Sequence, residues 1–392
     1  MCKEKITIAF AGLYNDDNLG DPVIARCTED MFLGCLPMER VNVKHISLNH
    51  FIYNEPAGCL KQWWRIAGLL KIKNEYIENR CITKEYIDYF YKELKGVDAV
   101  VIVGGGLLEF TGGRFSDGMY AIALAGDKHG FPVIINASGV EGYDENNSKC
   151  LEIKKMLHRP SIKYVSTRDD FDTLFNKYYD GKPTAECEKV ADPAVWAAEI
   201  FGVKRNCHSN VVGLGVVRSN IFENYGLKYS KEQLKTLYID IVKRLLAEGN
   251  QVHLFTNGTI ADNKFVYEIA ESFKKENVEL QIDIPETAEE LIKNIAQYKG
   301  VIAGRLHSCI ISYSLDIPAI GLVWNDKLSL FGKNIGEELN YMSVEQFDAE
   351  KIVQQLNRTI QDGYNQQIRD AFRQTIKKSI EKVVNKYIRV KL

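Results

Sequence analysis

Short apolar segments recur along the chain with stretches of helical periodicity between them, and this alternation restricts the possible folds more than any other feature. In the first half the apolar segments are ITIAFAG (6–12), VNVKHISL (41–48), DAVVIVGGG (98–106), FPVIINASG (131–139) and IKYVSTRDD (162–170). The third segment is almost entirely apolar, as a strand covered on both faces should be. Strands that alternate with helices predict βαβ units and parallel sheets, so the expected fold class is α/β.

The same pattern starts again in the second half of the chain. NVVGLGVVRSN (210–220) is typical of a new first strand and is followed by further alternating helices and strands. A chain of 392 residues is also too long for one ordinary domain. We therefore expect two similar α/β domains, over residues 1–200 and 201–365, and a separate amphipathic helix over 366–392.

Charge and cysteine content disfavour several functional classes. The chain has 50 basic against 52 acidic residues, whereas a general nucleic-acid binder is usually more basic, so we expect no nucleic-acid partner. The nine cysteines include no CxxC pair, which indicates reduced thiols, a cytoplasmic location, and neither a disulfide framework nor a metal site of the zinc type. No apolar run approaches the roughly 20 residues that span a bilayer.

Two segments raise the question of peripheral contact with the inner face of a membrane. In CLKQWWRIAGLLKIK (59–73), Trp63 and Trp64 lie beside basic residues, a pattern found at membrane interfaces. An ordinary half-buried helix remains the favoured interpretation there. The segment 366–392 has apolar residues at spacings of three and four opposite a Lys/Arg face. A closing helix packed on the domains is favoured for it, and a membrane-surface helix is the alternative.

Polar loops that follow the strands are the first place to look for a ligand site, because ligands of open parallel sheets bind at the carboxyl ends of strands. The first loop, GLYNDDNLGDPVIA, offers Asn15, Asn18 and Asp21 to a polar ligand such as a sugar. Asp21 precedes Pro22, so the alternative is that it only caps a helix. After the third strand, the glycines Gly105 and Gly106 allow a ligand to approach the backbone closely.

Neither glycine-rich segment matches a nucleotide-binding motif. The run at 104–106 is not a GxGxxG fingerprint, and in GLGVVR (213–218) an arginine replaces the third glycine. The chain also has no GxxxxGK[ST] sequence. We therefore expect neither a dinucleotide cofactor nor P-loop chemistry.

The second half places basic residues at successive strand ends. Arg218 leaves its strand where a guanidinium can grip a carboxylate or phosphate, with a surface salt bridge as the alternative. Arg305 and His307 follow the strand 301–303, and Lys327 follows the next one. His307 should stand in the first turn of a helix over 307–315, where it can act as a general acid toward an anionic ligand. Arg305 could instead point back and hold the histidine loop.

At this point the chain resembles the polysaccharide pyruvyl transferases. The resemblance rests on an ordered series of motifs over about residues 6–335: GLYNDDNLGD, VVIVGGGLLEF, STRDDFD, VADPAVW and, most of all, GRLHSCIISYSLDIPAIGLVWNDKL. The chain departs from the family's usual pattern at NASGVEGY (136–143) and at Trp324-Asn325. These departures concern the identity of the acceptor more than the reaction.

The resemblance implies a GT-B-like fold of two Rossmann-like domains facing a central cleft. From the polar, glycine-containing loops of the first half we expect the acceptor on the N-terminal side, and from the basic residues of the second half the donor on the C-terminal side. It implies phosphoenolpyruvate as donor, a free or lipid-linked glycan as acceptor, and a pyruvate ketal on a bacterial-type cell-surface polysaccharide, such as capsule or exopolysaccharide, as product. His307 matches the family's proposed catalytic histidine, Arg218, Arg305 and Lys327 are candidates for the donor anion, and no cofactor is needed. A nucleotide-sugar glycosyltransferase of the same fold is the alternative, and a glycan-binding protein without activity is a second one.

Overall fold

The computed structural model describes residues 5–14, 17–48, 87–111 and 115–389. The chain divides into two compact units. Unit 1 consists of Met1–Tyr14, Thr28–Val190 and Lys377–Leu392, and unit 2 of Asn15–Cys27 and Ala191–Ile376. The segment CLKQWWRIAGLLKIK, with its two tryptophans, lies outside the described residues. Among those that are described, no helix is both long enough and apolar enough to cross a membrane.

Unit 1 is built on a six-stranded parallel sheet with strand order β2-β1-β3-β4-β5-β6. The strands are β1 (Ile6–Gly12), β2 (Val41–Ser47), β3 (Ala99–Leu108), β4 (Val133–Val140), β5 (Ile162–Thr167) and β6 (Glu186–Lys189). The helices are α1 (Gly20–Leu33), η1 (Met38–Arg40), α4 (Phe115–His129), α5 (Ser148–Leu157), α6 (Phe171–Thr173) and η2 (Leu174–Tyr178), of which α1 begins in unit 2. The order changes direction at β1, which pairs with both β2 and β3.

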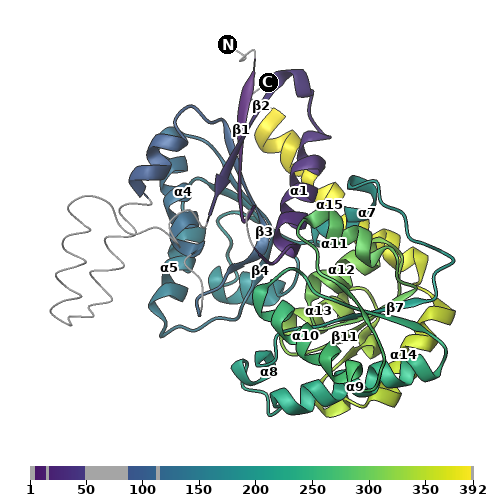
Figure 1. The fold of residues 1–392 in the computed structure, drawn as a ribbon. Helices are drawn as coiled ribbons and strands as arrows, with labels where there is room; N and C mark the ends of the chain where they lie inside the picture. The colour runs from purple at the N-terminus through teal and green to yellow at the C-terminus, as the bar shows by residue number, and fades with distance from the viewer. Residues whose placement is uncertain (1–4, 15–16, 49–86, 112–114, 390–392) are drawn as a thin grey trace. The chain divides into compact units, whose positions relative to one another are not determined.

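Helices cover both faces of this sheet, which explains why β3 and β4 are almost wholly apolar (Figure 1). One face packs against α4 and α5 in a core that includes Val100, Ile102 and Ile135. The other face meets α1, where Phe32 contacts Phe10, and the C-terminal helix α15 (Gln366–Val383). The continuous apolar run predicted a strand buried on both sides, and the structure confirms it.

Unit 2 repeats the architecture with strand order β12-β11-β10-β7-β8-β9, all pairs parallel. The strands are β7 (Val211–Gly215), β8 (Gln251–Phe255), β9 (Gln281–Asp283), β10 (Gly300–Ala303), β11 (Ala319–Leu322) and β12 (Tyr341–Met342). The helices are η3 (Pro193–Trp196), α7 (Ala197–Ile200), α8 (Ile221–Asn224), α9 (Lys231–Ala247), α10 (Ile260–Lys274), α11 (Ala288–Ile295), α12 (Leu306–Ser314), α13 (Asp326–Asn334), η4 (Glu338–Asn340), η5 (Val344–Gln346) and α14 (Ala349–Asp362). Here the strand order changes direction at β7, which pairs with β8 and β10.

The helix α15 contributes to both units, and each unit buries part of it. Within unit 2, the Arg369 guanidinium donates to the carbonyl oxygens of Tyr313 and Ser314. Within unit 1, the Ser379 hydroxyl lies 2.5 Å from the Tyr164 hydroxyl, and the following π-helix η6 (Val384–Ile388) carries groups that bind Glu186. On the apolar face predicted for this helix, Ile376, Ile380 and Val383 are buried, whereas Ile368 is exposed.

The division of the chain differs from the expected boundaries at three places. It falls between Val190 and Ala191 rather than at residue 200. It assigns residues 15–27 to unit 2, although they closely follow the first strand of unit 1, and it assigns residues 377–392 to unit 1.

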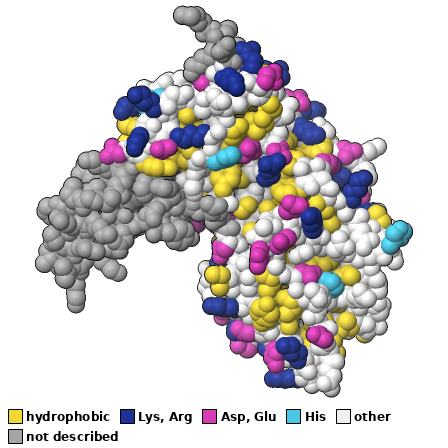
Figure 2. All heavy atoms as spheres, turned by 45° about the horizontal axis from the view of Figure 1, so that its top comes forward, with side chains coloured by type: hydrophobic (Ala, Val, Ile, Leu, Met, Phe, Trp, Pro, Cys, Tyr) yellow, Lys and Arg dark blue, Asp and Glu magenta, His cyan; other side chains and the backbone are white. Residues whose placement is uncertain are grey.

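On the face drawn in Figure 2, basic and acidic side chains are interspersed over the described residues, in line with the balanced composition.

Candidate functional site

His307 lies at the carboxyl end of β10, next to the point where the sheet of unit 2 changes direction. That point is where ligands of open parallel sheets bind. Arg305 takes the N-cap position of α12, and His307 is the second residue of the helix, close to the predicted start. The imidazole is 6% exposed, and its Nε2 lies 3.8 Å from Oδ2 of Asp192. The other carboxylate oxygen of Asp192 accepts the Ala194 N–H at 2.8 Å, so the carboxylate is held in place facing the ring.

The opposite side of the imidazole packs against the first residue of α1. A Cβ on Gly20 would lie 2.0 Å from Nδ1 of His307, so this position has no room for a side chain. The preceding residue is held by a hydrogen bond from the Leu19 N–H to the Asn257 carbonyl oxygen, at 2.9 Å. Sequence reasoning missed this role of Gly20. Its contact with His307, 287 positions away in the sequence, explains why the segment 15–27 belongs to unit 2.

Asn18 and Asp21 lie beside this contact, at the start of α1. The amide of Asn18 donates to Asp21 Oδ2 at 3.0 Å, and both side chains are partly exposed. The helix begins at Gly20, so Asp21 is in its first turn and is not the residue that precedes it, as a cap before Pro22 would be. Asn15 is outside the described residues. The predicted acceptor group is thus divided, because Gly105 and Gly106 belong to β3 of unit 1.

Arg305 points back into unit 2, which is the alternative raised by the sequence. Its Nε and Nη2 donate to the two carboxylate oxygens of Asp262 at 2.8 and 2.7 Å, and Asp262 is fully buried. Asp262 Oδ1 also accepts the Arg218 backbone N–H at 2.8 Å. This carboxylate, which sequence reasoning missed, therefore joins the loops after β7 and β10. In the sequence, Asp262 could have been noticed only because it lies three residues after Thr259, whose hydroxyl caps α10.

Arg218 and Asn257 each keep a buried N–H donor that has no partner among the described residues. For Arg218 the donor is Nε. For Asn257, which is 1% exposed, it is Nδ2, while its Oδ1 accepts the Ser308 hydroxyl at 2.6 Å. A buried donor without a partner costs about 1–3 kcal/mol, and more when it is charged. Both donors are therefore suited to an acceptor that a ligand supplies. Asn257 was missed, although its place two residues after the strand segment QVHLF (251–255) could have drawn attention to it.

Lys327 is the second residue of α13 and is partly buried. Asn325 caps this helix, and the indole N–H of Trp324 donates to the Gly304 carbonyl oxygen. This bond ties the end of β11 to the loop that carries Arg305 and His307. The segment between β11 and Lys327 is therefore attached to the segment that precedes Arg305.

Two further observations delimit the site. Within the described ranges, no group of three or more His, Cys, Asp or Glu side chains could hold a metal ion.

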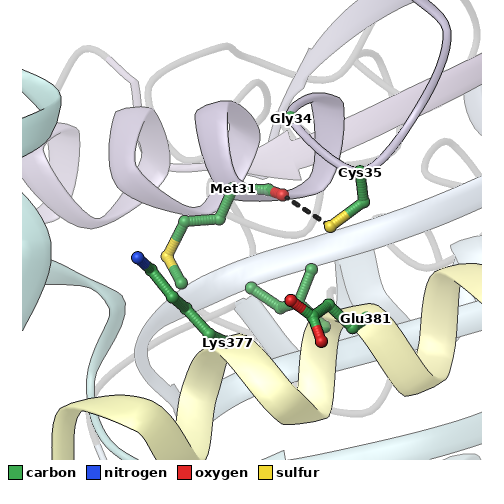
Figure 3. Close-up of a pocket in the computed structure, with 6 residues that line it drawn as sticks. Met31, Gly34, Cys35, Lys377 and Glu381 are labelled. Atoms are coloured by element: carbon green, nitrogen blue, oxygen red, sulfur yellow. Dashed lines mark hydrogen bonds between the residues drawn. The ribbon is translucent and has the colours of Figure 1, made fainter.

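In unit 1, a cavity of about 270 Å³ lies between α1 and α15 (Figure 3). It is lined by Met31, Gly34, Cys35, Lys377, Ile380 and Glu381. Burial and, to a smaller extent, Glu381 raise the pKa of the Cys35 thiol, so this cysteine is not an activated nucleophile. None of the predicted site residues lines this cavity.

Solved structures with a similar fold include UDP-sugar enzymes. UDP-GlcNAc 2-epimerase from Methanocaldococcus jannaschii aligns with a TM-score of 0.59 at 13% identity, over 97% of this chain and 99% of that one. A putative UDP-N-acetylglucosamine 2-epimerase from Listeria monocytogenes aligns with a TM-score of 0.58 at 11% identity, over 97% and 96%. S. aureus MnaA, solved with UDP, gives 0.55 at 11% identity, over 99% and 98%. At these identities the likeness concerns the fold, and it confirms the expected GT-B-like class.

Sequence comparison gives a more specific result than structure comparison. No curated protein matches the chain. A family model described as polysaccharide pyruvyl transferase, however, matches residues 39–326, which is more than half of the chain. The match extends from η1 to the first residue of α13 and includes Arg218, Arg305 and His307. The chain belongs to the polysaccharide pyruvyl transferase family.

Proposed function

We propose that the protein transfers the pyruvyl group of phosphoenolpyruvate to two hydroxyls of a glycan, forming a ketal, with His307 as general acid. The observation that carries this proposal is the position of the imidazole in the first turn of α12, held between Gly20 and Asp192. First-turn N–H groups favour an anion nearby. A phosphate and a carboxylate are the anions of this donor.

Cation and amide donors next to the histidine loop suit the binding of such a donor. We assign the two anionic groups of phosphoenolpyruvate to Arg218, whose Nε has no partner among the described residues, and to Lys327. Asn257 Nδ2 provides a further donor. Arg305 has the different task of holding the loop through Asp262, since two of its N–H groups are bound there.

In the reaction, the imidazolium of His307 donates a proton to the methylene carbon of phosphoenolpyruvate, which makes C2 electrophilic. The Asp192 carboxylate faces Nε2 of this ring at 3.8 Å. An acceptor hydroxyl then attacks C2, phosphate leaves, and a second hydroxyl of the same sugar closes the ketal ring. The products are the ketal and inorganic phosphate, and atoms balance without a redox partner.

For the acceptor, we propose that Asn18 and Asp21 bind glycan hydroxyls next to His307, with Asn15 in the same loop. Gly105 and Gly106 let the sugar approach the backbone of β3. We further propose that the acceptor, free or lipid-linked, is a precursor of a cell-surface polysaccharide such as a capsule, and that the reaction occurs in the cytoplasm or at the inner face of the membrane.

The alternative is a nucleotide-sugar enzyme. It is favoured by the fold, since one similar structure was solved with UDP and another, from Neisseria meningitidis, with UDP-GlcNAc. A diphosphate would use the same helix N-terminus and arginine.

The two proposals are separated by incubating the protein with a panel of glycans and either phosphoenolpyruvate or UDP-sugars. We expect phosphate release that depends on both phosphoenolpyruvate and glycan, with the glycan gaining the mass of one ketal-linked pyruvate. Turnover of UDP-sugars without release of phosphate from phosphoenolpyruvate would favour the alternative. Glycan binding without either reaction would indicate a binding protein.

A further inference from the structure

The carboxyl end of β4 in unit 1 carries a buried amide whose hydrogen-bonding capacity is unused. Asn136 is 1% exposed, and neither its Oδ1 nor its Nδ2 has a partner among the described residues. Most buried polar side-chain atoms in proteins have at least one partner, and leaving both atoms of an amide without one disfavours the folded state. Asn136 pairs in register with Val103, which directly precedes the three glycines of β3.

A buried carboxylate beyond the end of β5, that of Asp169, also has an oxygen without a hydrogen-bond partner among the described residues. Oδ1 of Asp169 accepts the N–H groups of Val140 and Asp170 and the Thr167 hydroxyl, at 2.8, 2.7 and 2.9 Å. Oδ2 has no partner in the described part of the chain, although the residue is 4% exposed. This oxygen lies 2.9 Å from the position that a Cβ of Gly139 would take. It therefore lies against β4, three residues beyond Asn136.

The backbone around these two groups is held in an unusual conformation. Ala137 has a φ of 49°, which is unfavourable for a residue with a side chain, and its N–H is bound by the Ser166 hydroxyl at 2.8 Å. The pairing of β4 is interrupted on both sides, between Ile135 and Ser138 toward β5 and after Gly105 toward β3. A Cβ on Gly139 would also lie 3.3 Å from the Gly105 carbonyl oxygen. One sheet end thus brings together the strained segment, the glycines and the incomplete polar groups.

We propose that Asn136 and Asp169 form a hydroxyl-binding site of unit 1 for the ring hydroxyls of the acceptor sugar. This inference rests on the proposed function, in which the acceptor is a glycan. A sugar hydroxyl both donates and accepts: it can donate to Asp169 Oδ2 while a neighbouring hydroxyl accepts from Asn136 Nδ2 and donates to its Oδ1. An anionic ligand fits poorly, because the unpartnered carboxylate oxygen would repel it.

The test measures sugar binding without any reaction. Methyl glycosides of glucose, galactose, mannose and N-acetylglucosamine are added to the full-length protein in the absence of phosphoenolpyruvate, and binding is detected by saturation-transfer NMR. We expect at least one glycoside to bind to the wild-type protein. Asn136→Leu, similar in shape but apolar, should weaken this binding at least tenfold while leaving Tm unchanged or higher, because it removes a buried amide without partners. Asn42→Leu, at an exposed position of β2, is the matched control and should keep full binding.

A second variant keeps the inference testable if Asn136→Leu does not fold. Asp169→Asn keeps Oδ1 as an acceptor for its three donors and changes only the unpartnered oxygen, from an acceptor into a donor. It should fold normally and bind the same glycoside at least several-fold more weakly. The inference is overturned if no glycoside binds to the wild type, if both variants bind normally, or if Asn136→Leu lowers Tm markedly, which would indicate a structural role. A different result would refute only the proposed function and leave this inference standing. In that case the glycoside binds in a manner that depends on Asn136, but the separate assay with phosphoenolpyruvate and glycan shows no turnover.

Discussion

The carboxyl ends of the two sheets both hold buried polar side chains, but they differ in which of the polar atoms have partners. In unit 2 these buried side chains are paired: Arg305 binds both oxygens of Asp262, and Asp192 faces His307. The buried atoms left without partners there include the N–H donors of Arg218 and Asn257. In unit 1 the strands end in glycines and a strained alanine, and two of the three unpartnered atoms of Asn136 and Asp169 are oxygens.

The difference indicates which kind of ligand each sheet end can accept. Unpartnered donors in unit 2 suit an anion, and unpartnered oxygens in unit 1 suit hydroxyl groups, which can donate to them. A transferase that joins an anionic donor to a sugar needs both kinds of site. The predictions below test this contrast, first by breaking the paired charges of unit 2.

The largest stability change is expected from Asp262→Ala. This change leaves the Arg305 guanidinium buried without its partner and removes the acceptor of the Arg218 backbone N–H. Breaking a buried pair in this way should lower the free energy of unfolding by about 3–5 kcal/mol. Chemical denaturation measures the change, with Asp240→Ala on the exposed side of α9 as control. If both variants lose equally little stability, the Asp262–Arg305 pair does not hold the loops together.

Substitution of Gly20 should disturb the histidine directly. In Gly20→Ala the new Cβ would lie 2.0 Å from Nδ1 of His307, so the ring or the helix must move, at a cost of about 1–3 kcal/mol. We expect a loss of kcat as well as a lower Tm. The same substitution at Gly34, just past the other end of α1, serves as control, because the nearest atom there is 3.1 Å away. Normal kcat in Gly20→Ala would show that the imidazole is not confined by this contact.

Removal of the Arg218 side chain should weaken donor binding and leave the fold intact. The bond from its backbone N–H to Asp262 does not depend on the side chain, so Arg218→Ala keeps that link. Loss of a charged hydrogen bond should reduce the affinity for phosphoenolpyruvate by about 1.5–3 kcal/mol. Calorimetric titration measures this loss, and Lys327→Ala should act in the same direction. Full affinity in both variants would move the donor site elsewhere.

The smallest effect concerns the way in which unit 1 holds the end of the chain. Hydrogen bonds from Lys386 and then Tyr387 lower the pKa of the Glu186 carboxyl to about 2, from the usual 4.5. Because the pKa in the folded state is the lower one, the stabilisation is complete above about pH 4.5 and is lost as the pH falls toward 2. Glu186→Gln should therefore lower Tm slightly at pH 7 and make no difference near pH 2. A difference in Tm that does not change with pH would contradict this assignment.

The sequence was sufficient to predict most of the strands and the place of the histidine, but the short strands β6, β9 and β12 were not predicted. The apolar run of β3 and the restart of the pattern at β7 follow from local periodicity, and the Arg-Leu-His segment directly after an apolar strand indicated the start of α12. The contacts of that segment could not be predicted in this way. The packing of Gly20 against His307 and the pairing of Arg305 with Asp262 join residues that are far apart in the chain, and periodicity carries no information about such pairs.

The kcat of His307→Ala, measured with phosphoenolpyruvate and a glycan that the wild-type protein modifies, tests the central claim most directly. General-acid loss reduces rates by about 10²–10⁴. The variant should show a decrease of this size while phosphoenolpyruvate still raises its Tm, and His208→Ala, an exposed histidine of unit 2, should keep normal kcat. A His307→Ala protein with nearly normal kcat would remove the histidine from the chemistry and contradict the account.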